Sequence, residues 1–538
     1  MRQALRGSAF RAVPQLGSRF LGRAARDALE GASIPAPVKG WDAANPLAEM
    51  DPASAVFLDN WFPEPTYCRL RAGHTSWATG LGSTQVESLM TYHGASGTNK
   101  MFGACGTNVY DVTATGAVGA ADISSTGNAR FQHINFTTPG GHFLVIANGS
   151  IAIRNYDGAS WTTPSITNVT SSDIIGLASH QHRIWMVQVN STKAWYLPID
   201  SIAGAAAGYE FGTFFTDGGY LNAIGTWTQD SGAGSDDLLA AISSRGQVAV
   251  FAGTDPSSST TWALKGVYKI GAPIGRRCFT KVGGDLAVIT VDGVVSLATS
   301  IQIDRAVARK AAITSNIQNA MNQAAKSYKD NFGWQLIQYP LGTAVYLNVP
   351  ITQSTLYYQY VMNPLTGAWC RYKGMNAACW EINNDDIFFG GRAGVVYQAD
   401  DGNTDNGTQI VYDLKTAFNY FKSRGRNKAF RMVRANMFGD GRCLPTITIN
   451  GDFRESPEPT TVVGVLQNSG VNWNDFDWND GTLWGGGQVT FGDWIGVEDQ
   501  GHCAAIRMKV APLSQSSTLP IDLRLNSFDV LHQPGSFL

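Results

Sequence analysis

The sequence is poor in charge for its length. Only 15% of its 538 residues are Asp, Glu, Lys or Arg, against roughly 25% in typical soluble domains. The 40 basic and 42 acidic residues nearly cancel and leave a formal net charge of −2. The net charge of the whole chain therefore does not indicate binding to nucleic acid, which is negatively charged. Much of the surface must therefore be neutral, or be covered by another chain.

Several motifs of common enzymes and metal sites are also missing. The chain has no Gly-Lys dipeptide, which excludes a phosphate-binding P-loop, and it has no G-x-S-x-G, H-E-x-x-H or G-x-G-x-x-G motif. Its seven cysteines contain no C-x-x-C pair and form neither a zinc ligand set nor a disulfide framework. We expect reduced, mostly buried thiols, no cofactor, no metal and no enzymatic activity.

Long apolar segments are absent as well. No apolar run approaches the roughly 18 residues that a membrane-spanning helix needs. The N-terminal segment lacks the uninterrupted apolar stretch of a secretory signal peptide. We therefore expect a soluble protein that is made in a cytosol.

What the N-terminal segment does contain is arginine. Six arginines precede the first acidic residue, Asp27; they are Arg2, Arg6, Arg11, Arg19, Arg23 and Arg26. We interpret residues 1–40 as an arm that folds onto a negatively charged partner, which these arginines would contact. A floppy tail and an organelle transit peptide are the alternatives.

After a Pro-rich stretch at Ala32–Pro52, which we interpret as an extended linker, the pattern is that of β-strands. Val, Ile and aromatic residues concentrate in short runs that clusters of Gly, Asn, Asp and Ser separate. The predicted strands include Val86–His93, Asn108–Thr113, Gly141–Asn148, Arg183–Val189, Asp237–Ser243, Gln247–Gly253 and Asp285–Val291.

Recurring hairpins predict a β-propeller. A turn, a glycine and two or three β-forming residues recur, mostly near the 40 to 50 residues of a four-stranded blade. The best single unit, Leu356–Asp400, resembles a kelch blade. Within it, Gly367 supplies the turn of a hairpin and Trp369 is predicted to be structural. We assign residues 41–299 to the first part of the propeller and 331–412 to its last blades.

Two further segments have their own patterns. Ser300–Lys329 contains no Gly or Pro, and its apolar residues predict one long helix within a helical segment at 300–330. Residues 413–538 alternate like half-buried strands and predict a C-terminal β-sandwich. The predicted fold class is therefore mainly β: a propeller with one or more kelch-like blades, one long helix and a C-terminal sandwich.

The candidates for metal binding and acid catalysis are weak. His180 and His182 would point the same way on a strand, but no third ligand is near. The loops Asp400–Gly407 and Asn474–Trp484 resemble calcium loops with misplaced ligands, and we interpret both as solvent-facing turns whose side chains bond their own backbone. Paired acids at Asp236–Asp237 and Asp385–Asp386 lie beside turns, with no signal that links distant carboxylates as glycoside hydrolysis requires.

The order of segments resembles the tail-nozzle proteins of short-tailed bacteriophages, also called packaged-DNA stabilisation or tail hub proteins. The resemblance extends from about Asp42 to about Phe453. The matching stretches are Met50–Pro65 (MDPASAVFLDNWFPEP), Arg69–Gly80 (RLRAGHTSWATG), Asn331–Pro340 (NFGWQLIQYP), Val361–Tyr372 (VMNPLTGAWCRY), Ile387–Ile410 and Asn427–Phe438 with the NGDF that follows it. The resemblance does not extend to the N-terminal arm.

This resemblance implies a structural virion protein without catalytic activity. Family members form a ring, typically a homohexamer, below the portal and its adaptor, and extend the channel for DNA ejection. They retain packaged DNA together with a needle or plug, and they offer attachment surface for fibres or spikes. The expected partners are thus other copies of the chain, the tail adaptor or head-tail connector, and the needle, plug, fibre or spike proteins. DNA would pass through a neutral or acidic lumen without specific binding.

The expected location is the tail of a virion assembled in the host cytoplasm. Two other functions stay open from the residues. The first is a receptor- or glycan-binding propeller on a virion or cell surface, in which Trp473, Trp478 and Trp484 would stack on sugar rings. The second is a propeller hydrolase, which would depend on a catalytic carboxylate.

Overall fold

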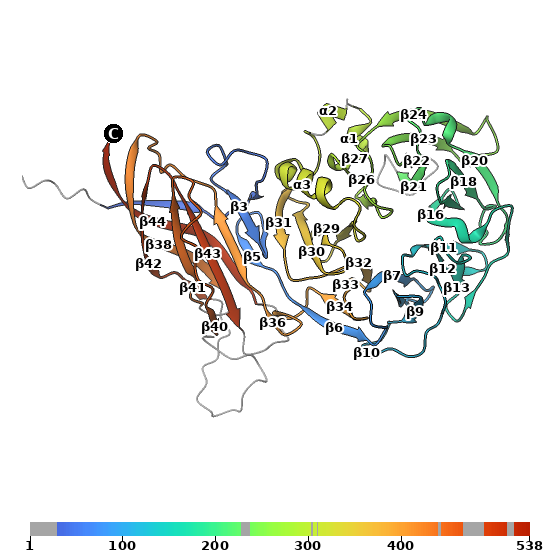
Figure 1. Ribbon diagram of the computed structural model, residues 1–538, viewed down its shortest axis with the longest axis horizontal. Coiled ribbons are helices and arrows are strands. Elements are labelled where there is room, and N and C mark those ends of the chain that lie inside the picture. Colours follow the sequence, from blue (N-terminus) through green and yellow to red (C-terminus); the bar gives the residue numbers. More distant parts are fainter. Residues whose placement is uncertain are drawn as a thin grey trace, which may run out of the picture.

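The computed structural model describes residues 29–227, 237–302, 305–308, 310–439, 443–465, 489–513 and 521–537. Strands contain 52% of the residues and helices 6%, which confirms the predicted mainly β class. Figure 1 shows two bodies side by side: a ring of sheets, and a body of long strands that contains the last part of the chain. In the part of the chain that is described, no helix has the length and apolarity needed to cross a membrane.

The ring is a β-propeller, as predicted (Figure 1). Five separate antiparallel sheets follow one another around it, each built from strands that are close together in sequence. In order they are β7 (Val86–Tyr92), β8 (Lys100–Cys105) and β9 (Asn108–Asp111); β11 (Gln132–Thr138), β12 (Gly141–Ala147), β13 (Arg154–Tyr156) and β14 (Trp161–Thr162); β16 (Ile174–His180), β17 (Arg183–Gln188), β18 (Lys193–Tyr196) and β20 (Ala207–Glu210); β21 (Leu221–Trp227), β22 (Leu238–Ser243), β23 (Gln247–Gly253) and β24 (Trp262–Lys269); and β25 (Phe279–Val282), β26 (Asp285–Thr290) and β27 (Gly293–Ser296). Short strands and 3₁₀-helices connect them: β10 (Gly116–Ala117), β15 (Ile166–Thr167), β19 (Gly204–Ala205), η1 (Ser171–Asp173) and η2 (Gly212–Phe214).

Two four-stranded units that belong to larger sheets close the ring. The first contains β28 (Gln335–Tyr339), β29 (Ala344–Thr352), β30 (Leu356–Asn363) and β31 (Ala368–Tyr372). The second contains β32 (Cys379–Asn383), β33 (Asp386–Gly390), β34 (Val396–Ala399) and β6 (His74–Thr79). Strand β6 precedes the first blade in sequence, yet it pairs antiparallel with β34. Backbone hydrogen bonds thus fasten the start of the propeller to its end.

The kelch-like unit predicted at Leu356–Asp400 is divided between these two units. β30 and β31 pair with β29 on one side, whereas β32 to β34 form the next unit with β6. The single-blade prediction was wrong because the fourth strand comes from far upstream. A strand can form its backbone hydrogen bonds with a strand that is far away in sequence, so proximity in sequence does not show which strands share a sheet.

The hairpin inside that stretch is as predicted. β30 and β31 pair from Gln359↔Tyr372 to Asn363↔Ala368. Gly367 has a φ of 69°, a conformation that glycine adopts without steric cost, and its amide donates to the Asn363 carbonyl at 2.8 Å. Trp369 is fully buried, which confirms its structural role.

The single long helix predicted within 300–330 was wrong. The segment forms α1 (Leu297–Ser300), α2 (Arg305–Ala308), η3 (Ser315–Ile317) and α3 (Gln318–Tyr328). The Ile313 amide donates to the Val294 carbonyl at 2.9 Å, and the Val294 amide donates to Thr314 Oγ1 at 3.1 Å. Both Ile313 and Thr314 are β-branched and therefore weak helix formers, so hydrogen bonds to β27 replace the helical ones there.

The second body combines strands from both ends of the chain. β38 (Arg426–Gly439) pairs with β44 (Leu523–Phe537), and β1 (Glu30–Pro35) pairs with β44 over all six of its residues. The stretch expected to be a linker thus contributes a sheet strand. In a second sheet, β3 (Ser54–Asp59) pairs with β37 (Tyr412–Thr416), which continues through β43 (Ala504–Leu513) to β39 (Thr446–Gly451). The remaining strands are β2 (Gly40–Trp41), β4 (Trp61–Pro63), β5 (Cys68–Leu70), β35 (Thr404–Asp405), β36 (Thr408–Gln409), β40 (Val463–Val465), β41 (Val489–Phe491) and β42 (Trp494–Gly501). The β-sandwich predicted for 413–538 stays a prediction.

One sheet and one core connect the two bodies. The ten-stranded sheet runs from β28 of the propeller through β31, β2 and β3 to β37 and β39 of the second body. A single cluster of buried apolar side chains likewise includes Leu336 and Val361 in the propeller and Trp61, Leu414 and Phe430 in the second body. The seven cysteines are all buried and unpaired, as expected.

Candidate functional site

A depression lies at one end of the propeller, near its centre. It consists of two adjoining cavities of about 620 and 700 Å³, which share Gly275, Arg276, Lys329 and Asp330. First strands of neighbouring blades, such as β7 and β11 or β11 and β16, contact one another and surround the centre of the ring. The cavities are lined mainly by loops before first strands and by turns between second and third strands, so several blades contribute to one site. We call this site the axial depression.

Cationic side chains dominate the axial depression. Arg130, Arg276, Arg277 and Lys329 line the smaller cavity. Arg245 and Arg305 join Arg276 and Lys329 in the larger one. The carboxylates that line the cavities are Glu87, in the smaller one, and Asp330, in both.

Arg277 holds two blades together through one of its nitrogens. Its Nη2 donates to Ser88 Oγ at 2.6 Å and to the carbonyl oxygens of Glu87 and Phe131 at 3.0 Å each. Burial lowers the pKa of this guanidinium. Because its hydrogen bonds connect β7 to the loop before β11, we assign Arg277 a structural role.

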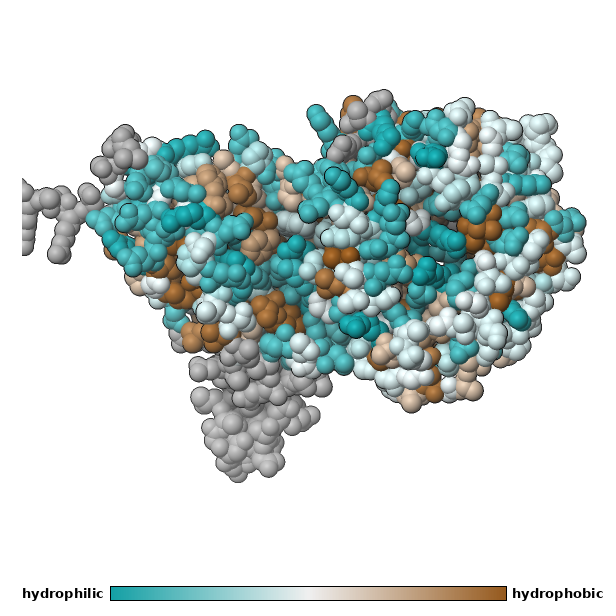
Figure 2. Space-filling model, in the orientation of Figure 1, coloured by the Kyte–Doolittle hydropathy of each residue, from teal (hydrophilic) through white to brown (hydrophobic). Residues whose placement is uncertain are grey.

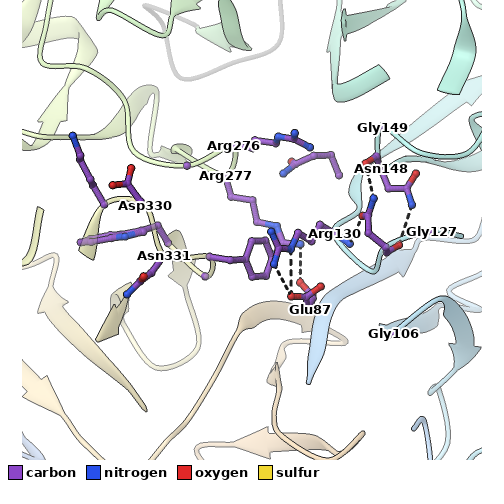
Figure 3. A pocket seen from close by; sticks show the side chains of 17 residues that line it. Glu87, Gly106, Gly127, Arg130, Asn148, Gly149, Arg276, Arg277, Asp330 and Asn331 are labelled. Atoms are coloured by element: carbon purple, nitrogen blue, oxygen red, sulfur yellow. Dashed lines mark hydrogen bonds and ion pairs between the residues drawn. The ribbon is translucent and has the colours of Figure 1, made fainter. Parts of the chain in front are cut away.

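Arg130 is also paired. Its Nη2 lies 3.2 Å from Glu87 Oε1, and its guanidinium carbon lies 4.3 Å from the centre of the Phe332 ring. Figure 3 shows Arg130 and Arg277 meeting beside Glu87, whereas Arg276 leaves the same loop in another direction.

Arg276 differs from these neighbours. It is exposed to solvent, and no hydrogen bond or ion pair joins its guanidinium to another described residue. Burial of part of the side chain lowers its pKa, and the charge of Arg130 lowers it further. Lys329 and Arg245 are likewise exposed and have no ion pair within the described ranges, whereas Arg305 Nε lies 2.7 Å from Asp292 Oδ2. A depression with this excess of unpaired positive charge attracts anions.

A half-buried acid–histidine pair lies on first strands of the ring. His133 Nε2 on β11 and Glu381 Oε2 on β32 are 3.6 Å apart. Burial raises the pKa of Glu381 to about 8 and lowers the pKa of His133 to about 4. Near neutral pH both side chains are therefore mostly uncharged, and together they add little charge to the ring.

Those residues singled out from the sequence that the structure describes lie elsewhere. Several others lie outside the described residues: the six arm arginines, the three C-terminal tryptophans, the loop Asn474–Trp484 and Asp236. His180 is buried, with a pKa lowered to about 4 by desolvation, and His182 pairs with Asp200 at 3.1 Å. Within the described ranges, no three or more His, Cys, Asp or Glu side chains are grouped so that they could hold a metal ion.

The calcium-like loop Asp400–Gly407 has a structural role. Asp405 accepts two hydrogen bonds from Arg71, at 2.8 and 2.6 Å, and Asp401 accepts one from Thr75 Oγ1 at 2.6 Å. The prediction of a solvent-facing turn was wrong for Asp405, whose side chain is only 11% exposed. Arg71, which directly follows β5 and is distant in sequence, satisfies its carboxylate.

That contact is part of a buried polar network where the propeller meets the second body. Asp59 accepts from Arg371 at 2.7 and 2.9 Å and from Lys373 at 2.6 Å. Asn60 Oδ1 accepts from Arg71 Nε and from the Lys373 amide, both at 2.9 Å. We call these residues, with Asp405, the junction network. Its members come from β3, β5, β31, β35 and the residues next to them.

Comparisons with known proteins place the chain in no family. No family model and no curated protein matches it. One similar solved structure is the crystal structure of the computationally designed Ika8 protein, with 12% identity and a TM-score of 0.32 over 60% of this chain and 99% of that one. Another is BBS1N in complex with ARL6DN, with 8% identity and a TM-score of 0.25 over 58% of this chain and 77% of that one. At these TM-scores neither structure bears on what this chain does.

The sequence contained one sign of the axial depression. Arg276 and Arg277 form an Arg-Arg pair directly after a glycine, in a chain that has few charges. Arg130 and Lys329 come from loops before other blades, and only the closed ring brings the four together.

Proposed function

We propose that this protein is a structural subunit of the tail nozzle of a short-tailed bacteriophage. It would assemble as a ring, typically of six copies, below the portal and its adaptor. There it would extend the DNA ejection channel and help to retain packaged DNA. In this role the chain needs no catalytic residue, and its partners are other copies of itself, the tail adaptor and the distal plug, needle, fibre or spike proteins.

The observation that carries the proposal is the origin of the junction network. Four of the stretches that resemble nozzle proteins contribute to it or adjoin it: Met50–Pro65, Arg69–Gly80, Val361–Tyr372 and Ile387–Ile410. The residues in contact are 312 and 334 positions apart in sequence, yet Asp59 meets Arg371 and Arg71 meets Asp405. Sequence stretches that are far apart along the chain thus meet in one structural feature, the junction between the propeller and the second body.

The surface also supports an assembly role. Large exposed apolar side chains on or beside the strands of the second body include Leu444, Val462 and Trp494, which are 70%, 53% and 37% exposed. Figure 2 shows apolar patches on that body. Contact between copies of a chain buries such side chains, and buried interface centres are poor in charge, in agreement with the low charge content.

The test is reconstitution of the full-length chain with a tail adaptor ring from the same virus. We expect ring-shaped particles by electron microscopy, and a mass that corresponds to several copies of this chain on one adaptor ring. A chain that stays monomeric and does not bind the adaptor at micromolar concentration would overturn the proposal. A monomer in the absence of the adaptor would not, because the ring can close on its partner.

The same experiment can also test the N-terminal arm. A variant with Arg2, Arg6, Arg11, Arg19, Arg23 and Arg26 all replaced by Gln should bind an acidic partner more weakly, and the loss should shrink as salt rises. Six exposed arginines changed to Gln elsewhere on the chain are the matched control. Unchanged binding would assign the arm to the floppy-tail alternative.

A further inference from the structure

The axial depression combines a cationic surface with space for a ligand. Arg276, Lys329 and Arg245 are exposed and have no counter-ion among the described residues, while the other arginines around them are paired. A guanidinium donates two parallel hydrogen bonds to the oxygens of a phosphate, sulfate or carboxylate. Arg276 lies where the two cavities meet, so an anion beside it could extend into either.

The size and lining of the cavities indicate what else the ligand contains. Volumes of about 620 and 700 Å³ lie within the usual range for small-molecule sites. Tyr220 is 39% exposed at the larger cavity and offers an aromatic face. Gln132 and Asn190 make no side-chain hydrogen bond to a described residue and provide polar groups for hydroxyls. Figure 2 shows that hydrophilic residues also gather over the middle of the ring on the face drawn.

We propose that the axial depression binds a compact hydroxylated ligand that carries an oxyanion group. Arg276 would be the main anion contact, with Lys329 beside it. The oxyanion could be the phosphate of a sugar phosphate or the carboxylate of an acidic sugar, since both present two or three oxygens to a guanidinium. This binding does not depend on ring assembly and goes beyond the nozzle function.

Asp330 gives the proposal a gain-of-binding test. Its carboxylate is exposed, has no ion pair with a described residue and lines both cavities together with Arg276 and Lys329. A like charge beside an anion opposes binding, so Asp330→Asn should tighten the complex. A variant that merely damaged the fold would not produce this result.

The experiment is isothermal titration calorimetry on the full-length chain at constant ionic strength. The probes are inorganic phosphate, a hexose phosphate, glucuronate and neutral glucose. We expect at least one acidic probe to bind to one site, with glucose much weaker. Arg276→Gln should weaken that binding by about tenfold or more, and Asp330→Asn should tighten it by about threefold.

The control variant is Arg431→Gln. Arg431 is exposed on β38 of the second body, so this change removes the same charge far from the depression and should leave binding unchanged. Binding of both phosphate probes without glucuronate would identify a phosphate ligand. Binding of glucuronate and the hexose phosphate without free phosphate would show that the sugar contributes. Failure of every acidic probe at millimolar concentration, equal binding of glucose, or equal losses in Arg431→Gln and Arg276→Gln would each overturn the proposal.

Discussion

The junction network and the axial depression both contain arginines, but they use them in opposite ways. At the junction, Arg71 is 1% exposed and donates two hydrogen bonds to Asp405, and Arg371 binds Asp59 through two nitrogens. In the axial depression, Arg276 is exposed and has no partner among the described residues. The junction arginines are satisfied within the chain, whereas Arg276 faces solvent beside paired arginines such as Arg130.

This difference separates a structural role from a binding role. A buried charge is tolerated only with a partner, and removal of that partner leaves a desolvated ion. An exposed, unpaired cation contributes little to folding but stays available to an anion. The four predictions below test this contrast, from the largest expected effect to the smallest.

Loss of a junction carboxylate should cause the largest change. Asp405→Ala leaves the buried Arg71 guanidinium and His74 without their carboxylate, and we expect the free energy of unfolding to fall by about 3–5 kcal/mol. Chemical denaturation measures it. The matched control is Asp217→Ala, which removes an exposed pair with Lys269 and should cost less than about 1 kcal/mol. Equal losses in the two variants would remove the distinction.

The cost of replacing a glycine by alanine should also differ between Gly40, which pairs with Trp369 on the junction strand β31, and Gly275 in the axial depression. Gly40 has a φ of 76°, and a Cβ there would lie 2.4 Å from the Trp369 carbonyl oxygen. Gly40→Ala should therefore cost about 2–5 kcal/mol, from the left-handed backbone and the clash together. Gly275 in the axial depression has a φ of 71°, and its nearest neighbour would be 3.6 Å away, so Gly275→Ala should cost only about 1–2 kcal/mol. The two melting temperatures provide the comparison.

The pH dependence of stability should report the half-buried Glu381. Its pKa is raised to about 8 in the folded protein, so the folded state binds more protons than the unfolded state above pH 4.5, and stability falls as pH rises toward 8. His133, with its pKa lowered to about 4, acts in the opposite direction, and only below about pH 6.5.

Between about pH 6.5 and 8, Glu381 should therefore reduce the stability of the wild-type chain by up to about 1.4 kcal/mol per pH unit. Glu381→Gln has no titrating group there and should show a flatter profile. Denaturation at several pH values measures the difference between the two proteins. Parallel profiles would mean that Glu381 is ionised in the folded state.

The smallest effect on folding should come from the axial depression itself. Arg276→Gln removes a cation that has no partner among the described residues and is repelled by Arg130, so the free energy of unfolding should change by no more than about 0.5 kcal/mol. A large loss of stability would give Arg276 a structural role and end the contrast with the junction.

Much of the local structure could be predicted from the sequence. The strands at Gln247–Gly253 and Arg183–Gln188, and the hairpin around Gly367, follow from runs of β-forming residues and from a glycine that adopts a positive φ. These features depend on residues close together in the chain. The predicted helix is interrupted at Ile313 and Thr314, because both residues form hydrogen bonds with Val294 on the neighbouring strand β27.

By itself the sequence determined the class of the protein: strand-rich, full of turns, with free thiols and few charges. Only the tertiary structure decided which strands share a sheet, because β6 reaches β34 across most of the propeller. The same holds for the two sets of arginines. Whether a guanidinium meets a carboxylate, as Arg71 meets Asp405, or faces an open cavity, as Arg276 does, depends on contacts between residues that lie far apart in the chain.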